Sequence, residues 1–167
     1  MYLEYIYNTC KLRGSEKNVK RKSIMQLTRH TDYALRVLMY LAAKPKETIS
    51  VVELAEFYNI SRNHLVKVVQ GLVMHKFVIT TRGKSGGMQL ASDSSQISIG
   101  AVVRKMENHF NLVECFDSGQ SGCVLDGSCY LKSIIASAAE EFLQKLDDVS
   151  LKEVTKPKLR GLIVSLQ

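Results

Sequence analysis

The sequence has few cysteines and no long hydrophobic run. Four cysteines in 167 residues are too few for a disulfide-stabilised scaffold, which a chain of this length does not need. A membrane-spanning helix takes about 18 or more consecutive apolar residues, and no stretch of the sequence approaches that length. Apolar residues still make up 46% of the chain, which is typical of a folded protein and excludes a disordered one. We therefore expect a folded protein with no contact to a membrane.

The chain also lacks the order of charge and hydrophobicity found in a secretory signal. Apolar and aromatic residues come first, interrupted by Glu4, and the basic residues follow them, whereas a signal begins with the basic residues. We therefore expect a cytoplasmic protein. Residues 1–24 show no sustained helical or strand period. They are interpreted as an N-terminal extension that is either disordered or not native, in which case Met25 is the true start.

No catalytic motif is recognisable. The sequence contains no nucleophile elbow, no paired histidines of a metal hydrolase and no phosphate-binding loop placed between a strand and a helix. Its four histidines are scattered along the chain: His30, His64, His75 and His109. The sequence therefore predicts that the protein is not an enzyme.

Positive charge is concentrated in the first part of the chain. Residues 1–92 contain 15 Lys and Arg against 6 Asp and Glu, a net charge of +9, whereas residues 93–167 contain 8 against 10, a net charge of −2. A basic region of this kind is typical of nucleic-acid binding. An ordinary solvated surface also carries Lys and Arg, so the motifs have to decide between the two interpretations.

Hydrophobic periodicity predicts two helices after the extension. Apolar residues recur at helical spacing over residues 28–43, and Pro45 ends that segment. Ser50, followed by Glu53 three residues later, is typical of a capping box. It predicts a short helix over residues 51–57.

A further helix begins after Ser61, separated from the preceding one by a three-residue break. Two helices joined by so short a turn are typical of a helix-turn-helix, whose second helix enters the major groove of DNA. Polar and basic side chains capable of contacting base edges or phosphates occupy its N-terminal and outer surface. These candidate DNA-binding residues are Ser61, Arg62, Asn63, His64, Lys67 and Gln70.

A β-hairpin is predicted directly after the second helix of this motif. Residues 77–81 and 88–91 have strand composition, and residues 82–87 (RGKSGG) form a tight basic turn. Cations on such a turn suit the DNA backbone, so Arg82, Lys84 and Ser85 are further candidate DNA-binding residues. A nucleotide-binding loop is the competing interpretation, but the turn lacks the Walker spacing. The predicted fold is a mostly α winged helix-turn-helix with a small β-hairpin, occupying residues 25–92.

The rest of the chain is predicted to carry a loop and a dimerisation helix over residues 93–149, followed by a C-terminal tail over 150–167. A helix is expected at about 97–108, and a long amphipathic helix at about 129–148. The long apolar stripe consists of Leu131, Ile134, Ile135, Ala138, Phe142, Leu146 and Val149. It exceeds what one small domain covers and predicts packing against a second copy of the chain, which suits a palindromic DNA site. The alternative is that the helix folds back on its own domain.

Three of the cysteines lie close together in a loop of small polar residues. Cys115, Cys123 and Cys129 have the spacing C-x7-C-x5-C, whereas Cys10 stands apart. Zinc knuckles use shorter spacings, while iron–sulfur clusters are held by thiolates and commonly take four ligands. Spacing alone leaves open a metal centre and a redox-active thiol cluster. Nearby donors for a fourth ligand position are His109, Glu114, Asp117 and Asp126.

Taken together, these motifs resemble the Rrf-type winged-helix iron–sulfur regulators, and within that family its nitric-oxide-sensing repressors. The matching stretches are residues 25–36 (MQLTRHTDYALR), 60–69 (ISRNHLVKVV), the turn 82–87 and the three clustered cysteines. The resemblance covers about residues 25–148. It implies a homodimeric repressor that binds a palindromic promoter site on double-stranded DNA and releases it when nitric oxide attacks the cluster.

The resemblance also implies a set of cluster ligands. Cys115, Cys123 and Cys129 would be the thiolate ligands of a four-iron or two-iron cluster. Asp32 matches the carboxylate that such proteins offer from the opposite subunit, and Arg36, one helical turn later, would orient it. The alternative function is a regulator of the same fold that senses thiol redox state or iron–sulfur status without specificity for nitric oxide.

Overall fold

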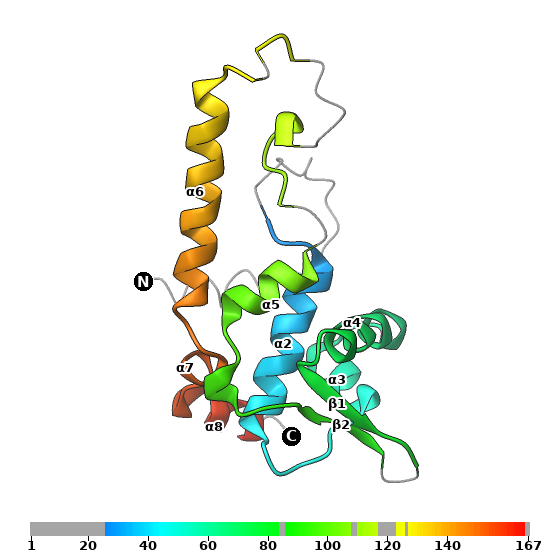
Figure 1. Cartoon of the computed structure of the whole chain (residues 1–167). Helices are drawn as coiled ribbons and strands as arrows, with labels where there is room; N and C mark the ends of the chain where they lie inside the picture. Colours follow the sequence, from blue (N-terminus) through cyan, green and yellow to red (C-terminus); the bar gives the residue numbers. More distant parts are fainter. Residues whose placement is uncertain (1–25, 84–85, 108–109, 117–122, 126, 166–167) are drawn as a thin grey trace, which may run out of the picture.

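The protein is described here from a computed structural model. It describes residues 26–83, 86–107, 110–116, 123–125 and 127–165 (Figure 1). The predicted extension over residues 1–24 lies outside the described residues, as do Cys10, Lys84 and Ser85.

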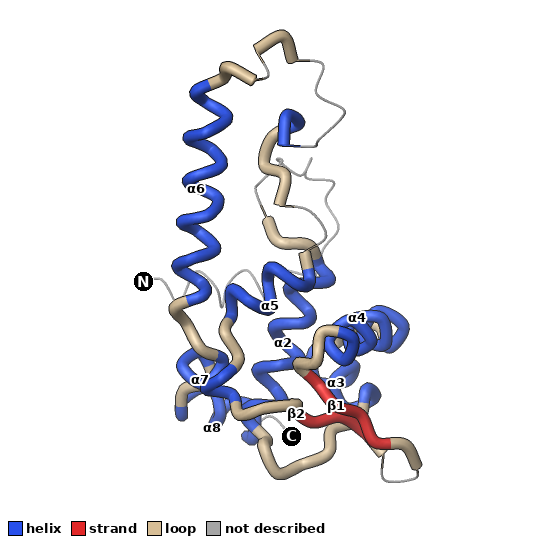
Figure 2. Tube along the Cα trace, viewed as in Figure 1, coloured by secondary structure: helices blue, strands red, loops and turns tan. Residues whose placement is uncertain are grey.

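The first part of the described chain is a winged helix. Its elements are α2 (Arg29–Ala43), α3 (Val51–Tyr58), α4 (Arg62–Met74), β1 (Val78–Thr81) and β2 (Gly87–Leu90). The two strands pair antiparallel and project beyond the helices (Figure 2). The predicted mostly α fold with a small β-hairpin is therefore confirmed, with boundaries within two residues of those expected.

Hydroxyl side chains define where these helices begin. Thr28, Ser50 and Ser61 are the N-caps of α2, α3 and α4, and each accepts a hydrogen bond from the backbone N–H three residues later. Such caps satisfy N–H groups that have no partner within the helix. The Ser50 half of the predicted capping box is thus present. The Glu53 carboxylate instead accepts hydrogen bonds from the Tyr40 hydroxyl at 2.7 Å and from the Lys44 ammonium at 3.3 Å.

The core lies between α2 and the elements around it. Apolar side chains of α2 are fully covered, among them Val37, Leu38 and Tyr40, each with 0% of its surface exposed. Leu54 of α3 and Leu65 of α4 are covered to the same extent. These side chains form the inward faces of the three helices. They hold the helix-turn-helix together by burial of apolar surface.

The second part of the chain adds one long helix that extends beyond the winged helix. Its elements are η1 (Ser94–Gln96), α5 (Ile99–Met106), η2 (Glu114–Phe116), α6 (Tyr130–Asp147), α7 (Leu151–Val154) and α8 (Pro157–Ser165). The C-terminal part of α6 lies beside α5, while its N-terminal part rises past the winged helix (Figure 1). Both predicted helices of this region are present, and α5 is two residues shorter at each end than expected.

Residues 150–165, part of the expected C-terminal tail, contain α7 and α8, which pack against α2. Leu151 and Ile163 are 0% and 3% exposed. The Arg160 Nε donates to the Ala43 carbonyl at 3.0 Å, which places a cation at the C-terminal, negative end of α2. An α7 of four residues is too short to show a helical period, so the sequence pattern does not reveal it.

Within the described residues, no helix combines the length and the apolar composition needed to cross a lipid bilayer.

Candidate nucleic-acid interface and cysteine loop

Helix α4 has one buried and one exposed face. The four inward residues expected from the sequence are buried: Leu65, Val68, Val69 and Leu72. The candidate DNA-binding residues are all exposed to solvent: Ser61, Arg62, Asn63, His64, Lys67 and Gln70. Ser61 also caps the helix by accepting from the His64 N–H at 3.4 Å. The outer face of α4 therefore offers donors and acceptors to a ligand.

The exposed residues of α4 are not equivalent in position. Asn63, Lys67 and Gln70 are four and three residues apart, so they lie one above the other along the helix. This row points directly away from the buried face. Arg62 and His64 lie on opposite flanks of it. Helical geometry therefore favours Asn63, Lys67 and Gln70 as the centre of any contact made by α4, with the other two at its edges.

The back of α4 is held close to two other helices at Gly71. A methyl group in place of a Gly71 hydrogen would lie 3.0 Å from Cε of Met106 and 3.2 Å from Nε2 of His30. Met106 belongs to α5 and His30 to α2. Because a side chain at position 71 would push against both, Gly71 sets how deeply α4 sits in the fold. The sequence pattern did not mark this contact.

The wing stands next to α4. β1 and β2 are in register from Val78↔Leu90 to Thr81↔Gly87, and Met88 forms a bridge to Ile49 that ties the hairpin to the helices. Arg82 is exposed, as predicted for a contact with DNA. The structure adds Thr80 and Thr81 to the candidate DNA-binding residues, because their side chains are exposed at the end of β1. The sequence pattern predicts a strand at these positions and no contact with DNA.

Asp32 and Arg36 form a two-pronged ion pair on α2. The Arg36 Nη2 lies 2.8 Å from Asp32 Oδ2, and the Arg36 Nε donates to Asp32 Oδ1 at 3.0 Å. The Arg36 guanidinium lies 5.9 Å from the centre of the Tyr33 ring, and the Tyr58 hydroxyl donates to the Arg36 carbonyl at 3.0 Å. Burial raises the pKa of Tyr58 above its ordinary value, so this hydroxyl stays protonated as a donor. The Asp32 carboxylate is 44% exposed and remains accessible.

The cysteine loop opens onto a hollow beside the start of α6. Cys115 and Cys129 line the same open hollow of about 890 Å³, together with Phe116 and Tyr130. Both of these cysteines are half-buried free thiols. Cys123 is exposed and is not part of this lining. The structure thus brings together two of the three predicted thiolate ligands.

Soft thiolates suit iron–sulfur binding, so the donor chemistry of Cys115, Cys123 and Cys129 fits such a cluster. Among the residues that the structure describes, no three His, Cys, Asp or Glu side chains are gathered as a metal site. Three of the nearby donors, His109, Asp117 and Asp126, lie outside that part of the chain.

The apolar stripe predicted for α6 divides into two parts. Leu146 and Ile135 are half-buried, and Leu143, which was not in the predicted stripe, is buried. Leu131, Ile134 and Phe142 are exposed to 63%, 48% and 39% of their surfaces. One part of the stripe therefore covers the chain's own domain. The other is an exposed apolar face, here called the outer face of α6 (Leu131, Ile134, Ala138 and Phe142), on which the Phe142 ring stacks against Phe110 with the ring centroids 5.8 Å apart.

Comparison with known proteins places these features in a family. Residues 27–157 match the family model Rrf2, described as an iron-dependent transcriptional regulator. The chain is 45% identical to the HTH-type transcriptional regulator NsrR of Bacillus subtilis, over 80% of this chain and 92% of that protein. It is 43% identical to the NsrR of Oceanobacillus iheyensis, over 79% and 90%.

A solved structure shows the same fold. The structure of CymR, the global cysteine regulator of Bacillus subtilis, aligns with a TM-score of 0.65 and 22% identity, covering 79% of this chain and 97% of that one.

Proposed function

The chain belongs to the Rrf2 family of transcriptional regulators, and on that premise we propose that it is a cytoplasmic, homodimeric, nitric-oxide-sensing repressor. As a transcriptional regulator it binds DNA and is not an enzyme. The proposal adds three properties: a palindromic operator, an iron–sulfur cluster on the cysteine loop, and release of the operator in response to nitric oxide. The observation that carries it is the shared hollow of Cys115 and Cys129 at the start of α6, in a chain whose α4 presents an exposed polar row.

The winged helix would read the operator in two ways. The row of Asn63, Lys67 and Gln70 enters the major groove, where amides pair with adenine and a lysine pairs with guanine or with phosphate. Arg82, with Thr81 next to it, lies on the wing and suits the DNA backbone. Lys84 and Ser85 are kept as proposed contacts on the same turn. Base contacts then provide specificity and wing contacts provide affinity.

The cysteine loop would hold the cluster through Cys115, Cys123 and Cys129. The fourth ligand would be Asp32 of the partner subunit, whether the cluster has four irons or two. When bound, the cluster would supply the chemistry that reacts with nitric oxide. Arg36 holds the Asp32 carboxylate with two hydrogen bonds, so a single orientation is already favoured before any ligand binds.

Dimerisation would proceed through the outer face of α6. Exposed apolar residues gathered on one face mark an interaction site, and pairing of identical faces gives the two-fold symmetry that matches a palindrome. Two α4 helices held at a fixed separation could then occupy two half-sites one helical turn apart.

Anaerobic purification tests the proposal. We expect a coloured protein containing iron and sulfide that binds its operator, loses its visible absorption on addition of nitric oxide, and then releases the DNA. Cys115→Ser should abolish loading of iron, whereas Cys10→Ser should load normally. A colourless, metal-free protein that binds the operator equally well with and without nitric oxide would contradict the proposal.

A second candidate function is regulation by thiol redox state or by iron–sulfur status. It is favoured by Cys115 and Cys129, two half-buried thiols that face the same hollow. Metal analysis with a visible spectrum separates the two candidates. A metal-free protein whose operator affinity depends on thiol oxidation supports the redox candidate. An iron-loaded protein that responds to iron supply but not to nitric oxide supports the status candidate.

A further inference from the structure

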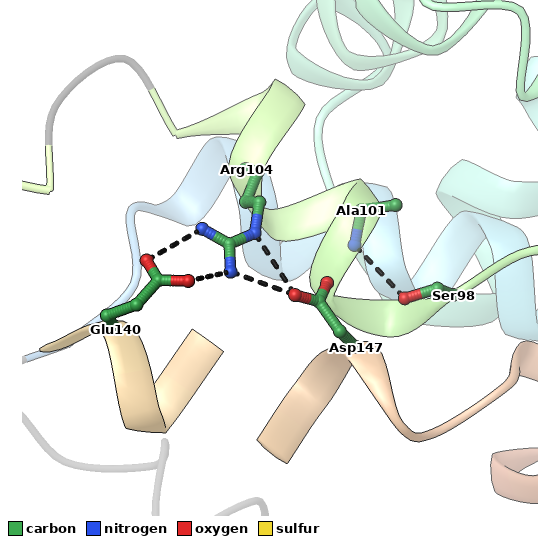
Figure 3. A network of polar contacts seen from close by, with 5 residues as sticks. All are labelled: Ser98, Ala101, Arg104, Glu140 and Asp147. Atoms are coloured by element: carbon green, nitrogen blue, oxygen red, sulfur yellow. Dashed lines mark hydrogen bonds and ion pairs between the residues drawn. The ribbon is translucent and has the colours of Figure 1, made fainter. Parts of the chain in front are cut away.

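One arginine connects the helix that follows the cysteine loop to the helix behind the DNA-binding face. Arg104 of α5 reaches two carboxylates of α6 (Figure 3). Its Nη1 and Nη2 donate to Glu140 at 3.1 and 2.8 Å, and its Nε and Nη2 donate to Asp147 at 3.2 and 2.8 Å. Glu140 and Asp147 are seven residues apart, so a single guanidinium spans two turns of α6.

This network is better suited to fixing an orientation than to stabilising the fold. The three side chains are 35%, 50% and 38% exposed, and exposed ion pairs contribute little to the free energy of unfolding. The planar fork of an arginine, however, binds carboxylates only in a narrow range of geometries. The pKa of Arg104 is raised and that of Glu140 lowered, mainly by their hydrogen bonds to each other. The contact therefore remains ionised at neutral pH.

The two helices also touch at a glycine one turn before Arg104. A methyl group in place of a Gly100 hydrogen would lie 2.6 Å from the backbone nitrogen of Asp147 and would collide with the Asp147 carboxylate. The first turn of α5 is therefore packed directly against the last turn of α6. With a close contact at one turn and the arginine fork at the next, α6 cannot rotate or slide without moving α5.

The other end of α5 meets the helices that carry the proposed DNA and ligand residues. Met106, 3% exposed, lies against Gly71 on the back of α4. Glu107, directly after α5, accepts a hydrogen bond from the Thr28 N–H at the start of α2, at 2.6 Å. A displacement of α5 therefore changes the support of α4 and of the first turn of α2, where Asp32 is located.

We infer that Arg104 is a positioning residue that couples the state of the cysteine loop to the orientation of α4, acting through Glu140, Asp147 and α5. This inference rests on the proposed function. According to this inference, α6 takes one position when a cluster bound to the cysteine loop holds its N-terminal end near Cys129. It takes another position when the cluster is lost. Because Arg104 is hydrogen-bonded to Glu140 and Asp147, a displacement of α6 also displaces α5. Without the fork, the packing of α5 against α6 at Gly100 remains, but the coupling between the two ends of the molecule is weaker.

The test compares operator binding by the full chain in its iron-loaded and metal-free forms. The probe is a duplex selected by the loaded wild-type protein from a random-sequence library. The quantity measured is the ratio of the operator affinities of the iron-loaded and metal-free forms. Coupling between two sites typically changes affinity about 5- to 150-fold, and we expect a ratio in that range for the wild type. Arg104→Gln should clearly lower this ratio while iron loading is unchanged, because only the packing at Gly100 then joins the two helices. Arg104→Lys keeps the positive charge but lacks the planar guanidinium, so it should retain only part of the wild-type affinity ratio.

Hydrogen exchange provides a readout that does not depend on DNA. In the wild type, loading should change the exchange of backbone amides in α4 as well as in α6. In Arg104→Gln the change in α6 should persist and the change in α4 should be much smaller. Equal loss of operator affinity in both forms, with the wild-type ratio retained, would overturn the inference, because Arg104 would then support the fold only. A ratio of one in the wild type overturns the proposed function itself, and this inference with it.

A second pair of variants guards against a folding defect at position 104. Glu140→Gln removes the charge of one carboxylate of the network. Glu141→Gln is the control next to it, because the exposed Glu141 accepts a hydrogen bond from Ser137 on the same helix. Lys105→Gln is the matched control on α5. We expect Glu140→Gln to lower the ratio and both controls to preserve it. The same ratio in Glu140→Gln and Glu141→Gln would overturn the inference.

Discussion

The two parts of the described chain differ in how completely they bury their apolar side chains. In the winged helix, Leu38, Leu54 and Leu65 are fully covered by the chain itself. Around the cysteine loop, Val124 is 98% and Leu131 63% exposed. The winged helix thus buries its apolar side chains within the chain, whereas the described residues of the cysteine region leave apolar side chains exposed.

The helix starts show the same contrast. Thr28, Ser50 and Ser61 each cap a helix of the winged helix by accepting a backbone hydrogen bond. Cys129, at the N-cap of α6, makes no side-chain capping hydrogen bond. A capped helix has one of its first-turn N–H groups satisfied by the cap. The start of α6 lacks this local contribution to helix stability.

The largest expected effect is on the stability of the winged helix. Leu38→Ala removes a fully buried side chain, and such a change costs about 2–5 kcal/mol of the free energy of unfolding. Val124→Ala, at a nearly fully exposed position, should change it by less than about 0.5 kcal/mol. Urea unfolding followed by circular dichroism measures both. Similar losses in the two variants would show that the cysteine region also has a packed interior.

The next largest effect concerns the outer face of α6. Leu131→Glu places a charge on the apolar surface and should weaken self-association by about thirtyfold, the effect of roughly 2 kcal/mol at an interface hot spot. Ser137→Glu, on another side of the same helix, is the control and should associate as the wild type does. Sedimentation velocity over a range of concentrations distinguishes the two. A Leu131→Glu protein that remains dimeric would mean that the dimer uses a different face.

A smaller effect is expected within α4, where the structure separates two roles. Asn63→Ala should cost about 1–3 kcal/mol against the preferred operator and little against mismatched DNA, because it removes a base contact. Lys67→Ala should weaken binding to all sequences and reduce the dependence of affinity on salt. Titrations at several salt concentrations report both. Arg62→Ala and His64→Ala, on the flanks of the row, should change specificity less than Asn63→Ala does.

The smallest effect tests a cap outside both regions. The Glu153 carboxylate accepts from the Ser150 N–H at 2.7 Å and from its hydroxyl at 2.8 Å, which lowers the pKa of Glu153 below its ordinary value of 4.5. A group with a lowered folded-state pKa stabilises the fold above its unfolded-state pKa, and this contribution is lost as the pH falls through the folded-state value. Glu153→Gln should therefore lower the melting temperature slightly at pH 7. The difference should shrink as the pH falls below the ordinary pKa of Glu153, and a difference that stays constant there would exclude a role for the charge.

Local sequence patterns were sufficient for the winged helix and for the polar face of α4. Ser50 and Ser61 mark helix starts, and the spacing of Leu65, Val68 and Leu72 marks the buried side of α4. These signals depend on neighbours within a few residues, so they can be recognised from the sequence without knowledge of the tertiary structure. The pairing of Asp32 with Arg36 is of the same kind, because residues four apart on a helix face each other.

Contacts between distant segments could not be predicted in this way. The packing of α7 and α8 on α2, the approach of Gly71 to Met106 and the reach of Arg104 to Glu140 each join residues more than thirty positions apart. The pattern on α6 predicts one continuous surface, yet Leu131 is 63% exposed while Leu146, about four turns along the same stripe, is half-buried. The position of α5 decides which part of the stripe is covered. A local sequence pattern carries no information about that position.

The chain's own order of residues thus established the basic winged helix, the row of candidate DNA contacts and the cluster of three cysteines, because each follows from spacing along a helix, a hairpin or a loop. The tertiary structure decided that Cys115 and Cys129 share a hollow while Cys123 lies apart from it, and that α6 is locked to α5 through Arg104 and Gly100. These arrangements depend on how helices pack, and packing is set by the shapes of surfaces brought together only when the whole chain folds.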